Sequence, residues 1–344
     1  MILKYKINKN LLFVGDLNTY TRTYQRYNIL RKIFDTTFYI STEDEYIPGI
    51  NKNNKSFLYR VFFKIGFQFD IKGINEKILS IVEKNKIDII WIEKVNYLKL
   101  SVLKKIKDNR ILIFYTNDNI NKLHNISLNY LLFIKYFDYL LIPEDYHNRY
   151  YKNKIKVFKF NRSFDDNFIS KVPYNPNKIL DVVFIGSYEY QRFQTLNYVA
   201  KRLNTQIHIF GNNWNKAKRA NNNLIIHNKP LYENDLIIKL RDTKIALNFL
   251  RKKNDDQTTG RTFEILATNT FMLSENSNLH SKLFINDLDC VFFDNNEDLI
   301  TKIKFYLINE KKRISIANNG CNKVHSLYTY QIWINKFLTD VYQS

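Results

Sequence analysis

A threonine pair, an arginine and a glutamate stand close together in the C-terminal half of the chain. Thr258 and Thr259 precede Arg261, and Glu264 follows three residues later, about one helical turn further on. Hydroxyl groups, backbone N–H groups and a guanidinium suit phosphates, and a carboxylate can accept hydrogen bonds from both hydroxyls of a ribose. The pattern indicates a nucleotide site. The alternative, that Glu264 only stabilises a helix N-terminus, is the weaker interpretation.

Two upstream segments carry related chemistry after short apolar runs. They are Gly186, Ser187 and Arg192 after residues 181–185, and Asn248 and Arg251 after residues 245–247. Backbone N–H groups beside a guanidinium would suit a diphosphate, although an exposed surface arginine explains Arg192 equally well. Near the N-terminus, Gly15 and Asp16 also follow an apolar run. Their pattern is a weaker signal of a ligand-binding loop, and a plain tight turn explains it at least as well.

These residues lie in a chain whose short apolar runs alternate with amphipathic stretches, which is typical of a doubly wound α/β fold. The sequence predicts strands near residues 11–14, 37–40, 87–92, 111–115, 139–142, 156–158, 181–185, 206–210, 224–227, 245–247, 270–273 and 291–293. It predicts helices at residues 23–34, 74–85, 97–107, 192–203, 233–242, 262–267 and 297–309.

The chain is long enough for two domains at 344 residues, and Pro173 and Pro176 mark a linker between the two series of strands. We expect one Rossmann-like domain over residues 1–171 and a second over residues 178–325. Tandem open sheets normally bind ligands in the cleft between them, at the carboxyl ends of the strands.

Composition narrows the class of protein. Apolar residues make up 45% of the chain, which excludes wholesale disorder, and Cys290 and Cys321 are too few and too far apart for a disulfide framework or a zinc site. The longest apolar stretch, residues 128–142, contains two charges and is too short to span a bilayer. Without a signal-peptide pattern, we expect a cytoplasmic protein.

The formal net charge of +20 fits a phosphorylated substrate, an anionic membrane surface or a nucleic acid. The lysines are dispersed, however, and the abundance of Lys, Asn, Ile and Tyr is what an AT-rich coding bias would produce. Mostly solvated lysines are therefore the favoured interpretation, and a nucleic-acid partner is not expected.

Several segments together resemble the CgeB-like (spore-maturation-type) family of GT-B glycosyltransferases over most of the chain. The matching segments are Ile74-Asn75, Ile87–Lys94, Tyr115–Asn119, Phe184–Glu189 with Arg192, Phe210–Trp214, Arg261–Glu264 and Lys312–Gly320. The Arg-Thr-Phe-Glu segment with its upstream threonines is specific. Departures are Leu266 in place of a proline, an extra Gly260, and Asn119 in place of a second aspartate, which removes one candidate carboxylate.

The resemblance implies two Rossmann-like domains facing across a cleft, with the last segment, residues 326–344, forming a helix that packs back toward the N-terminal domain. It implies sugar transfer from a nucleotide-sugar, bound by the C-terminal domain, to a glycan or lipid-linked acceptor in bacterial surface polysaccharide or glycoconjugate synthesis. No metal or other cofactor is expected, because helix dipoles and basic side chains can neutralise the leaving diphosphate. Asp287-Leu288-Asp289 has metal-motif spacing but suits a loop of ordinary solvated acids.

Under this hypothesis the donor-binding residues share one feature, a place in a loop after a predicted strand. They are Gly186, Ser187, Arg192, Gly211, Asn213, Trp214, Asn248, Arg251, Thr258, Thr259, Arg261 and Glu264. Arg192 and Arg261 would bind the diphosphate and Glu264 the ribose, while Asn213 and Trp214 would lie near the nucleoside or the sugar. If the reaction inverts, the base comes from the first domain; Asp118 is favoured, followed by Asp16, with Glu93 also a candidate.

Other interpretations stay open. The chain could be a catalytically inactive homologue that binds sugar nucleotides, a GT-B-type epimerase, or a basic nucleic-acid-binding protein. Residues 57–67 interleave aromatic residues with Arg60 and Lys64, and could dock peripherally on anionic lipid at the inner face of the membrane. An ordinary core-packing helix is the favoured interpretation of that segment.

Overall fold

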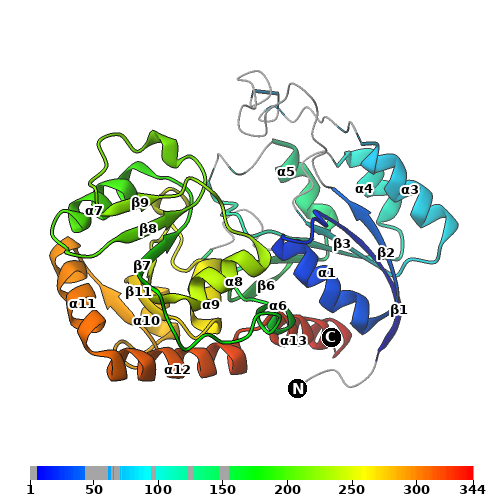
Figure 1. Ribbon diagram of the computed structural model, residues 1–344. Coiled ribbons are helices and arrows are strands. Elements are labelled where there is room, and N and C mark those ends of the chain that lie inside the picture. The colour runs from blue at the N-terminus through cyan, green and yellow to red at the C-terminus, as the bar shows by residue number, and fades with distance from the viewer. Residues whose placement is uncertain are drawn as a thin grey trace. The chain divides into compact units, whose positions relative to one another are not determined.

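The computed structural model describes residues 6–42, 61–62, 65, 70, 72–93, 98–122, 125, 128–146 and 155–343. The chain forms two compact units (Figure 1). The first unit consists of Met1–Asn161 and Tyr330–Ser344, and the second of Arg162–Thr329. Each contains a six-stranded parallel sheet with helices on both faces, which confirms the predicted α/β fold class.

In the first unit the strand order is β2-β1-β3-β4-β5-β6. The bounds are β1 (Ile7–Gly15), β2 (Phe34–Ser41), β3 (Ile89–Glu93), β4 (Ile111–Tyr115), β5 (Tyr139–Pro143) and β6 (Lys156–Phe160). Every residue of β3 is buried, as expected for a parallel strand that is covered on both faces.

Alternate residues of these strands point into two apolar clusters. Leu12 and Val14 pack with α3 (Ile74–Lys84), α4 (Leu100–Ile106), α5 (Leu128–Phe133) and the short 3-10 helix η1 (Ile134–Tyr136). Leu11 and Phe13 pack on the other face with α1 (Arg22–Ile33) and α13 (Tyr330–Gln343).

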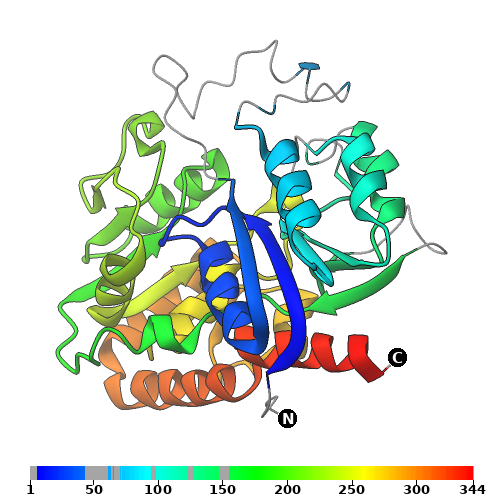
Figure 2. The ribbon, with the colours of Figure 1, turned by 90° about the vertical axis from the view of Figure 1, so that its right-hand side faces the viewer.

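Helix α13, the last helix of the chain, belongs to the first unit. Trp333 stacks on Phe160 with ring centroids 4.8 Å apart, and Phe337 meets Trp91 edge-on at 5.9 Å. Figure 2 shows α13, in red, close to the blue strands β1 and β2. Large aromatic side chains therefore join α13 to β3 and β6 in one core.

In the second unit the strand order is β12-β11-β10-β7-β8-β9. The strands are β7 (Leu180–Ile185), β8 (Ile207–Phe210), β9 (Leu224–Ile226), β10 (Thr243–Asn248), β11 (Phe271–Glu275) and β12 (Val291–Phe293). The helices are α6 (Asp166–Ile169), α7 (Tyr190–Ala200), α8 (Glu233–Arg241), α9 (Gly260–Ala267), α10 (Asn278–Leu283), α11 (Asn296–Ile308) and α12 (Glu310–Leu327), with 3-10 helices η2 (Trp214–Lys216) and η3 (Lys252–Asn254).

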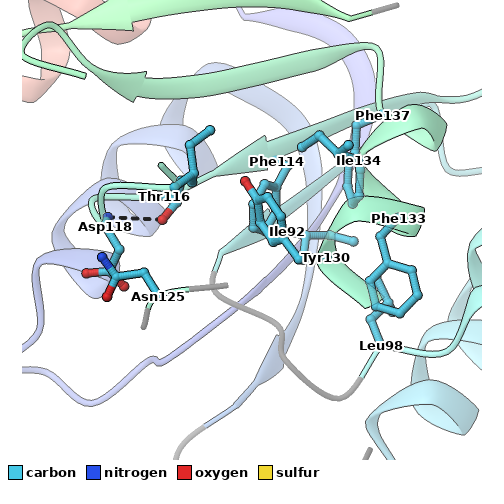
Figure 3. A pocket seen from close by; sticks show the side chains of 11 residues that line it. Ile92, Leu98, Phe114, Thr116, Asp118, Asn125, Tyr130, Phe133, Ile134 and Phe137 are labelled. Carbon is cyan, nitrogen blue, oxygen red and sulfur yellow. Dashed lines mark hydrogen bonds between the residues drawn. The ribbon is translucent and has the colours of Figure 1, made fainter. Parts of the chain in front are cut away.

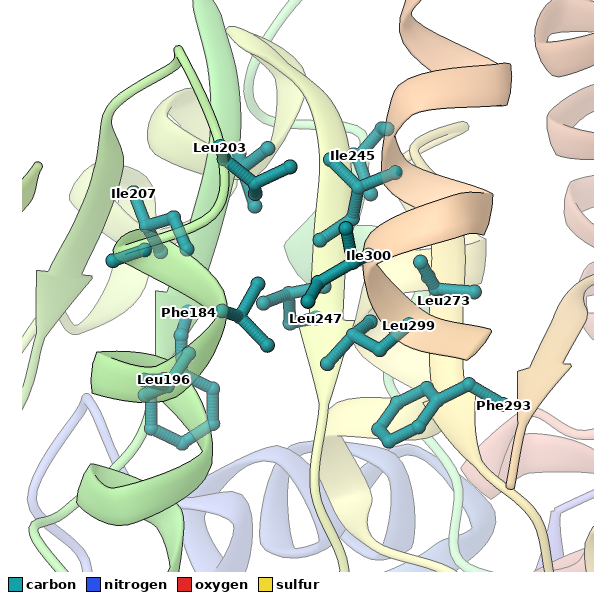
Figure 4. Packing of buried hydrophobic residues seen from close by; sticks show 14 of the residues in the cluster. Phe184, Leu196, Leu203, Ile207, Ile245, Leu247, Leu273, Phe293, Leu299 and Ile300 are labelled. Carbon is teal, nitrogen blue, oxygen red and sulfur yellow. The ribbon is translucent and has the colours of Figure 1, made fainter. Parts of the chain in front are cut away.

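Helices cover both faces of this sheet. Figure 4 shows one face, where Phe184 and Leu247 from the strands meet Leu196 of α7 and Leu299 of α11. On the opposite face Ile237 of α8 and other apolar side chains of α6, α9 and α10 form a second cluster. Among the residues that the structure describes, none of the helices has the length and apolarity that a membrane crossing requires.

The boundary between the units differs from the expected one. The second unit begins at Arg162, whereas the sequence placed residues 1–171 in the first domain and a linker at residues 172–177. Phe164, Phe168 and Ile169 are buried in the core of the second unit, so the prolines lie inside that unit and not between the two. At the other end, the expected segment 326–344 begins inside α12, which runs to Leu327.

Candidate functional site

The carboxyl ends of the second unit's parallel strands gather the loops that were singled out by sequence. Gly186 follows β7 and Gly211 follows β8; the Gly186 N–H donates to the carbonyl of Phe210 at 2.9 Å. A Cβ on Gly211, whose φ is +155°, would lie 2.0 Å from the Gly186 carbonyl oxygen. Glycine at residue 211 thus allows the two loops to lie in direct contact.

Trp214 has a structural role at this contact, contrary to its expected place near the nucleoside or sugar. The side chain is 1% exposed, and its Nε1 donates to the Gly186 carbonyl at 2.8 Å. Its ring also packs edge-on against Phe184 and Tyr188. Asn213, which precedes it, is exposed in a left-handed conformation. Trp214 therefore supports the loops that contain Gly186 and Gly211 from the interior of the unit.

Helix α9 begins in the predicted threonine-rich segment and is held by a buried polar network. Thr259 is the N-cap, accepts from Thr262 N–H at 3.2 Å and donates through Oγ1 to Asn248 Oδ1 at 3.1 Å. Asn248 Nδ2 donates to Thr262 Oγ1 and to Ser274 Oγ, each at 3.0 Å. These hydroxyls, of which only that of Thr259 was expected to support the phosphates, fix the N-terminus of α9 against the ends of β10 and β11.

Arg261 and Glu264 lie on the first turn of α9. Arg261 Nη1 is 2.8 Å from Glu264 Oε2, so the two side chains share one helix face, as their spacing predicts. Both remain partly accessible, with 19% and 10% of their side chains exposed. A cation and a carboxylate are thus presented together at a helix N-terminus, where the helix dipole favours anions.

Arg192 is more buried than a phosphate ligand is expected to be. Its Nη1 donates to the Ser187 carbonyl at 3.2 Å, and its Nη2 donates to the Phe249 and Leu250 carbonyls at 3.4 Å. Burial lowers the pKa of Arg192, opposed by Glu189 at 3.3 Å. Arg192 therefore joins the loops after β7 and β10, while Ser187 is exposed.

Arg251 is the more accessible cation of this loop pair. Its side chain is 55% exposed, and its Nε lies 3.8 Å from Glu189 Oε1. An exposed guanidinium beside the edge where the strands end can reach a bound anion without first giving up buried hydrogen bonds.

The structure adds residues that sequence reasoning missed. Arg162 Nη1 donates to the buried Thr258 Oγ1 at 3.0 Å, and its Nη2 lies 3.6 Å from Asp256 Oδ1. Glu275 Oε2 accepts from the Leu250 N–H at 2.6 Å, and burial raises the pKa of Glu275. A signal existed for Glu275, which ends a buried strand, but Arg162 is separated from Thr258 by 96 positions and was assigned to the other domain.

Asp287 and Asp289, which share the metal-motif spacing, are engaged within the fold. Asp289 is 5% exposed and lies 2.5 Å from Lys323 Nζ, while Asp287 accepts from the Tyr306 hydroxyl. The expectation of ordinary solvated acids is therefore wrong for Asp289. Within the described ranges, His, Cys, Asp and Glu side chains do not gather in threes as a metal site would require.

In the first unit, Glu93 at the end of β3 is occupied by four hydrogen bonds. Arg26 donates to it through Nε at 2.8 Å and Nη2 at 2.5 Å, Thr23 Oγ1 donates at 2.9 Å, and Trp91 Nε1 donates at 3.1 Å. The carboxylate is 4% exposed. A base must be free to take a proton, so Glu93 is better explained as the partner of a buried arginine.

Asp16 and Asp118 are only partly buried. Asp16 Oδ1 accepts from the Asn18 N–H at 3.1 Å and from Asn18 Nδ2 at 2.8 Å, which orders the loop after β1. The backbone N–H of Asp118 donates to Thr116 Oγ1 at 3.1 Å in the loop after β4.

Asp118 also borders a cavity of about 70 Å³, shown in Figure 3. Ile92, Phe114 and Ile134 form part of its apolar wall, whereas Thr116 and Asn125 lie with Asp118 at one end of the group. Most of residues 57–67, proposed above for membrane docking, lie outside the described residues.

Comparison with known proteins gives one family match. Residues 192–339 match a family model described as "Glycosyl transferase-like". A search of curated protein sequences gave no match.

Solved structures match over almost the whole chain, at low sequence identity. A glycosyltransferase from Rickettsia africae ESF-5 has 13% identity and a TM-score of 0.63, covering 96% of this chain and 97% of its own. An alpha-glucosyltransferase in complex with UDP and a 13-mer DNA has 11% identity and a TM-score of 0.70, covering 98% and 100%. Anabaena HepE in complex with UDP has 9% identity and a TM-score of 0.62, covering 97% and 99%. The chain therefore has the GT-B glycosyltransferase-type fold, and its sequence is glycosyl transferase-like over residues 192–339.

Proposed function

We propose that this protein is a glycosyltransferase whose second unit binds a nucleotide-sugar and whose first unit binds the acceptor. The observation that carries the proposal is the Arg261–Glu264 pair on the first turn of α9. Glu264 can accept hydrogen bonds from the two ribose hydroxyls, and Arg261 with the helix N-terminus can bind the diphosphate. UDP is the nucleotide in several solved structures of the same fold, which supports a UDP-sugar as donor.

In an inverting reaction Asp118 acts as the base. It takes the proton from the acceptor hydroxyl, and the hydroxyl oxygen forms the new bond to the anomeric carbon of the sugar. The bond from that carbon to the diphosphate breaks, and the nucleoside diphosphate leaves with the electron pair. Arg251, Arg261 and the N-terminus of α9 stabilise the charge that develops on the diphosphate, so the proposal needs no metal.

We further propose that the chain belongs to the CgeB-like group and acts in the synthesis of surface polysaccharide or glycoconjugates on the cytoplasmic side of the membrane. The Arg-Thr-Phe-Glu segment at residues 261–264 supports the group assignment. Peripheral contact with the membrane belongs to the same proposal, and sedimentation with anionic liposomes that decreases with salt would support it.

Calorimetry with UDP tests the donor site. Arg261→Ala and Glu264→Ala should each weaken binding by about 1.5–3 kcal/mol, or roughly 10- to 150-fold, because each removes a charged hydrogen-bonding partner. Arg202→Ala and Glu297→Ala are controls that make the same charge changes at side chains 45% and 67% exposed. Unchanged affinity in both test variants would place the donor elsewhere.

Nucleic acid is a second candidate for the acceptor. The net charge of +20 favours it, as does the alpha-glucosyltransferase of the same fold whose structure contains DNA. Binding to an unrelated oligonucleotide should then fall steeply with salt, and labelled sugar from UDP-glucose should become attached to the oligonucleotide. If the oligonucleotide binds but receives no sugar, its binding is a non-specific attraction to the positive charge, and nucleic acid is removed as a candidate acceptor.

A further inference from the structure

The cavity beside Asp118 has an apolar interior and a polar end (Figure 3). Its walls come from the end of β3, the end of β4, α5 and η1, through Ile92, Phe114, Phe133 and Ile134. The polar residues of the lining are Thr116, Asp118, Asn125 and Tyr130. All of these side chains belong to the first unit.

The size of the cavity limits what can enter it. At about 70 Å³ it has about half the volume of a ~150 Å³ protein cavity that binds benzene, so it holds about three carbon atoms. A whole sugar ring is too large for it. A ligand that uses this cavity must therefore bury a small group and leave its larger part outside.

The chemistry of the walls selects the kind of group. Most of the lining, including Ile92, Phe133 and Ile134, offers no hydrogen bonds, so a hydroxyl or charge buried among these side chains would lose its water without replacement. An anionic group would in addition be repelled by the Asp118 carboxylate at the polar end. A short aliphatic group avoids both costs, and burying it is favourable by the hydrophobic effect.

We propose that this cavity binds a short aliphatic group of the acceptor, about three carbon atoms long, and places a neighbouring hydroxyl group beside Asp118. This inference rests on the proposed function, in which Asp118 takes a proton from the acceptor. It assigns the acceptor to a chemical class, hydroxyl compounds that carry an alkyl or acyl substituent close to the reacting hydroxyl.

Methyl-labelled NMR of the full chain tests the inference with 1-propanol and glycerol, which share a three-carbon skeleton. We expect 1-propanol to shift the methyl signals of Ile92, Ile120 and Ile134 in a saturable manner, and glycerol to leave them unchanged. From methanol to 1-propanol the affinity should rise about fourfold for each added methylene. For longer alcohols, whose chains no longer fit in the cavity, the affinity should stop rising.

A pair of variants on adjacent residues of α5 locates the binding. Phe133→Trp adds bulk to the cavity wall and should abolish the response to 1-propanol, whereas Leu132→Trp, at a side chain 48% exposed, should preserve it. Ile134→Phe fills the cavity from η1 and is used in place of Phe133→Trp if that variant does not unfold cooperatively. Methyl groups of Ile209 and Ile245, buried in the second unit, should not respond to the alcohol in any variant.

The outcomes separate this inference from the proposed function. A response that is absent, that glycerol reproduces, or that survives both filling variants overturns the aliphatic site. Titration with UDP, read from Ile185 and Ile265 in the second unit, reports on the donor site independently. A protein that responds to UDP but not to 1-propanol would retain the proposed function without the aliphatic site.

Discussion

The carboxyl edges of the two sheets are built in different ways. In the second unit, Asn248, Thr259, Thr262 and Ser274 form a closed set of hydrogen bonds around the start of α9, and Thr262 also contacts the buried His280 at 3.0 Å. In the first unit, the corresponding edge has a cavity beside Asp118. A polar network fixes backbone N–H groups and suits a constant ligand such as a nucleotide, whereas a cavity selects by shape and polarity.

The first unit also contains two carboxylates with contrasting environments. Glu93 receives four hydrogen bonds and is buried, while Asp118 is partly accessible beside the cavity. Glu93 ends a buried strand and Asp118 closely follows one, so their positions in the sequence look alike. The contrast separates a structural carboxylate from a candidate base, and substitutions can test it directly.

The largest change should come from Asp118→Asn. Loss of a general base should lower the rate of sugar transfer about 10²- to 10⁴-fold, because the amide cannot take the acceptor proton. The free energy of unfolding should change by less than about 1 kcal/mol. Transfer assays and urea unfolding measure the two effects, and a variant that retains full activity would remove Asp118 from the mechanism.

Glu93→Gln should show the opposite pattern. Burial lowers the pKa of Arg26, but the Glu93 carboxylate together with Tyr115 and Tyr330 outweighs this and leaves the pKa raised, so the arginine stays charged in the core. Without the carboxylate, that charge is uncompensated, and the unfolding free energy should fall by about 3–5 kcal/mol. Urea unfolding checks this value. A stable but inactive Glu93→Gln protein would instead make Glu93 a candidate base.

In the second unit, Asn248→Ala tests whether the polar network holds α9. The substitution removes the partner of three hydroxyl groups, of which those of Thr262 and Ser274 are buried. We expect the free energy of unfolding to fall by about 2–3 kcal/mol and the binding of UDP to weaken. Asn212→Ala, at an exposed position in the loop after β8, is the matched control and should change stability by less than about 0.5 kcal/mol. Equal stability of the two variants would show that the network is dispensable.

The smallest effect concerns pH. Hydrogen bonds from His325 to Asp166, to Cys321 and to the Ala267 carbonyl raise the pKa of His325 to about 10, although burial opposes them. A raised pKa gives stability that is fully present below about pH 6.5 and is lost as the pH rises through about 10. The contribution should be about 1 kcal/mol or less, because both side chains are partly exposed.

Another group titrates in the same range with the opposite sign. Burial and the nearby Arg313 lower the pKa of Lys178 to about 8, which makes its charged form destabilising at lower pH. The quantity to measure is therefore the difference in unfolding free energy between wild type and His325→Gln from pH 6 to pH 10. A difference that does not shrink with rising pH would contradict the assigned role of His325.

Much of the fold could be predicted from sequence, because short apolar runs bounded by loops are a local signal. All twelve described strands lie at or next to the predicted ranges. Helix α12 was not among the predicted helices, since its residues are mostly polar and only Ile316, Ala317 and Val324 among its apolar side chains are buried. The boundary at Arg162 was missed because proline marks a turn whether or not the turn separates domains.

The candidate site was predicted less well. Local spacing placed Arg261 and Glu264 on one helix face, which the ion pair agrees with. The interior position of Trp214, three of the four hydrogen bonds of Glu93 and the contact of Arg162 with Thr258 depend on residues distant in the chain. A polar residue after a strand looks the same in sequence whether it binds a ligand or holds the fold together.

Helix α13 has a consequence for the order in which the protein folds during synthesis. The first unit needs residues from both ends of the chain, since Trp333 and Phe337 pack against Trp91 and Phe160. The second unit is one continuous segment, residues 162–329, and emerges from the ribosome complete before α13 does. Part of the aromatic surface of β3 and β6 therefore stays uncovered until α13 has been translated.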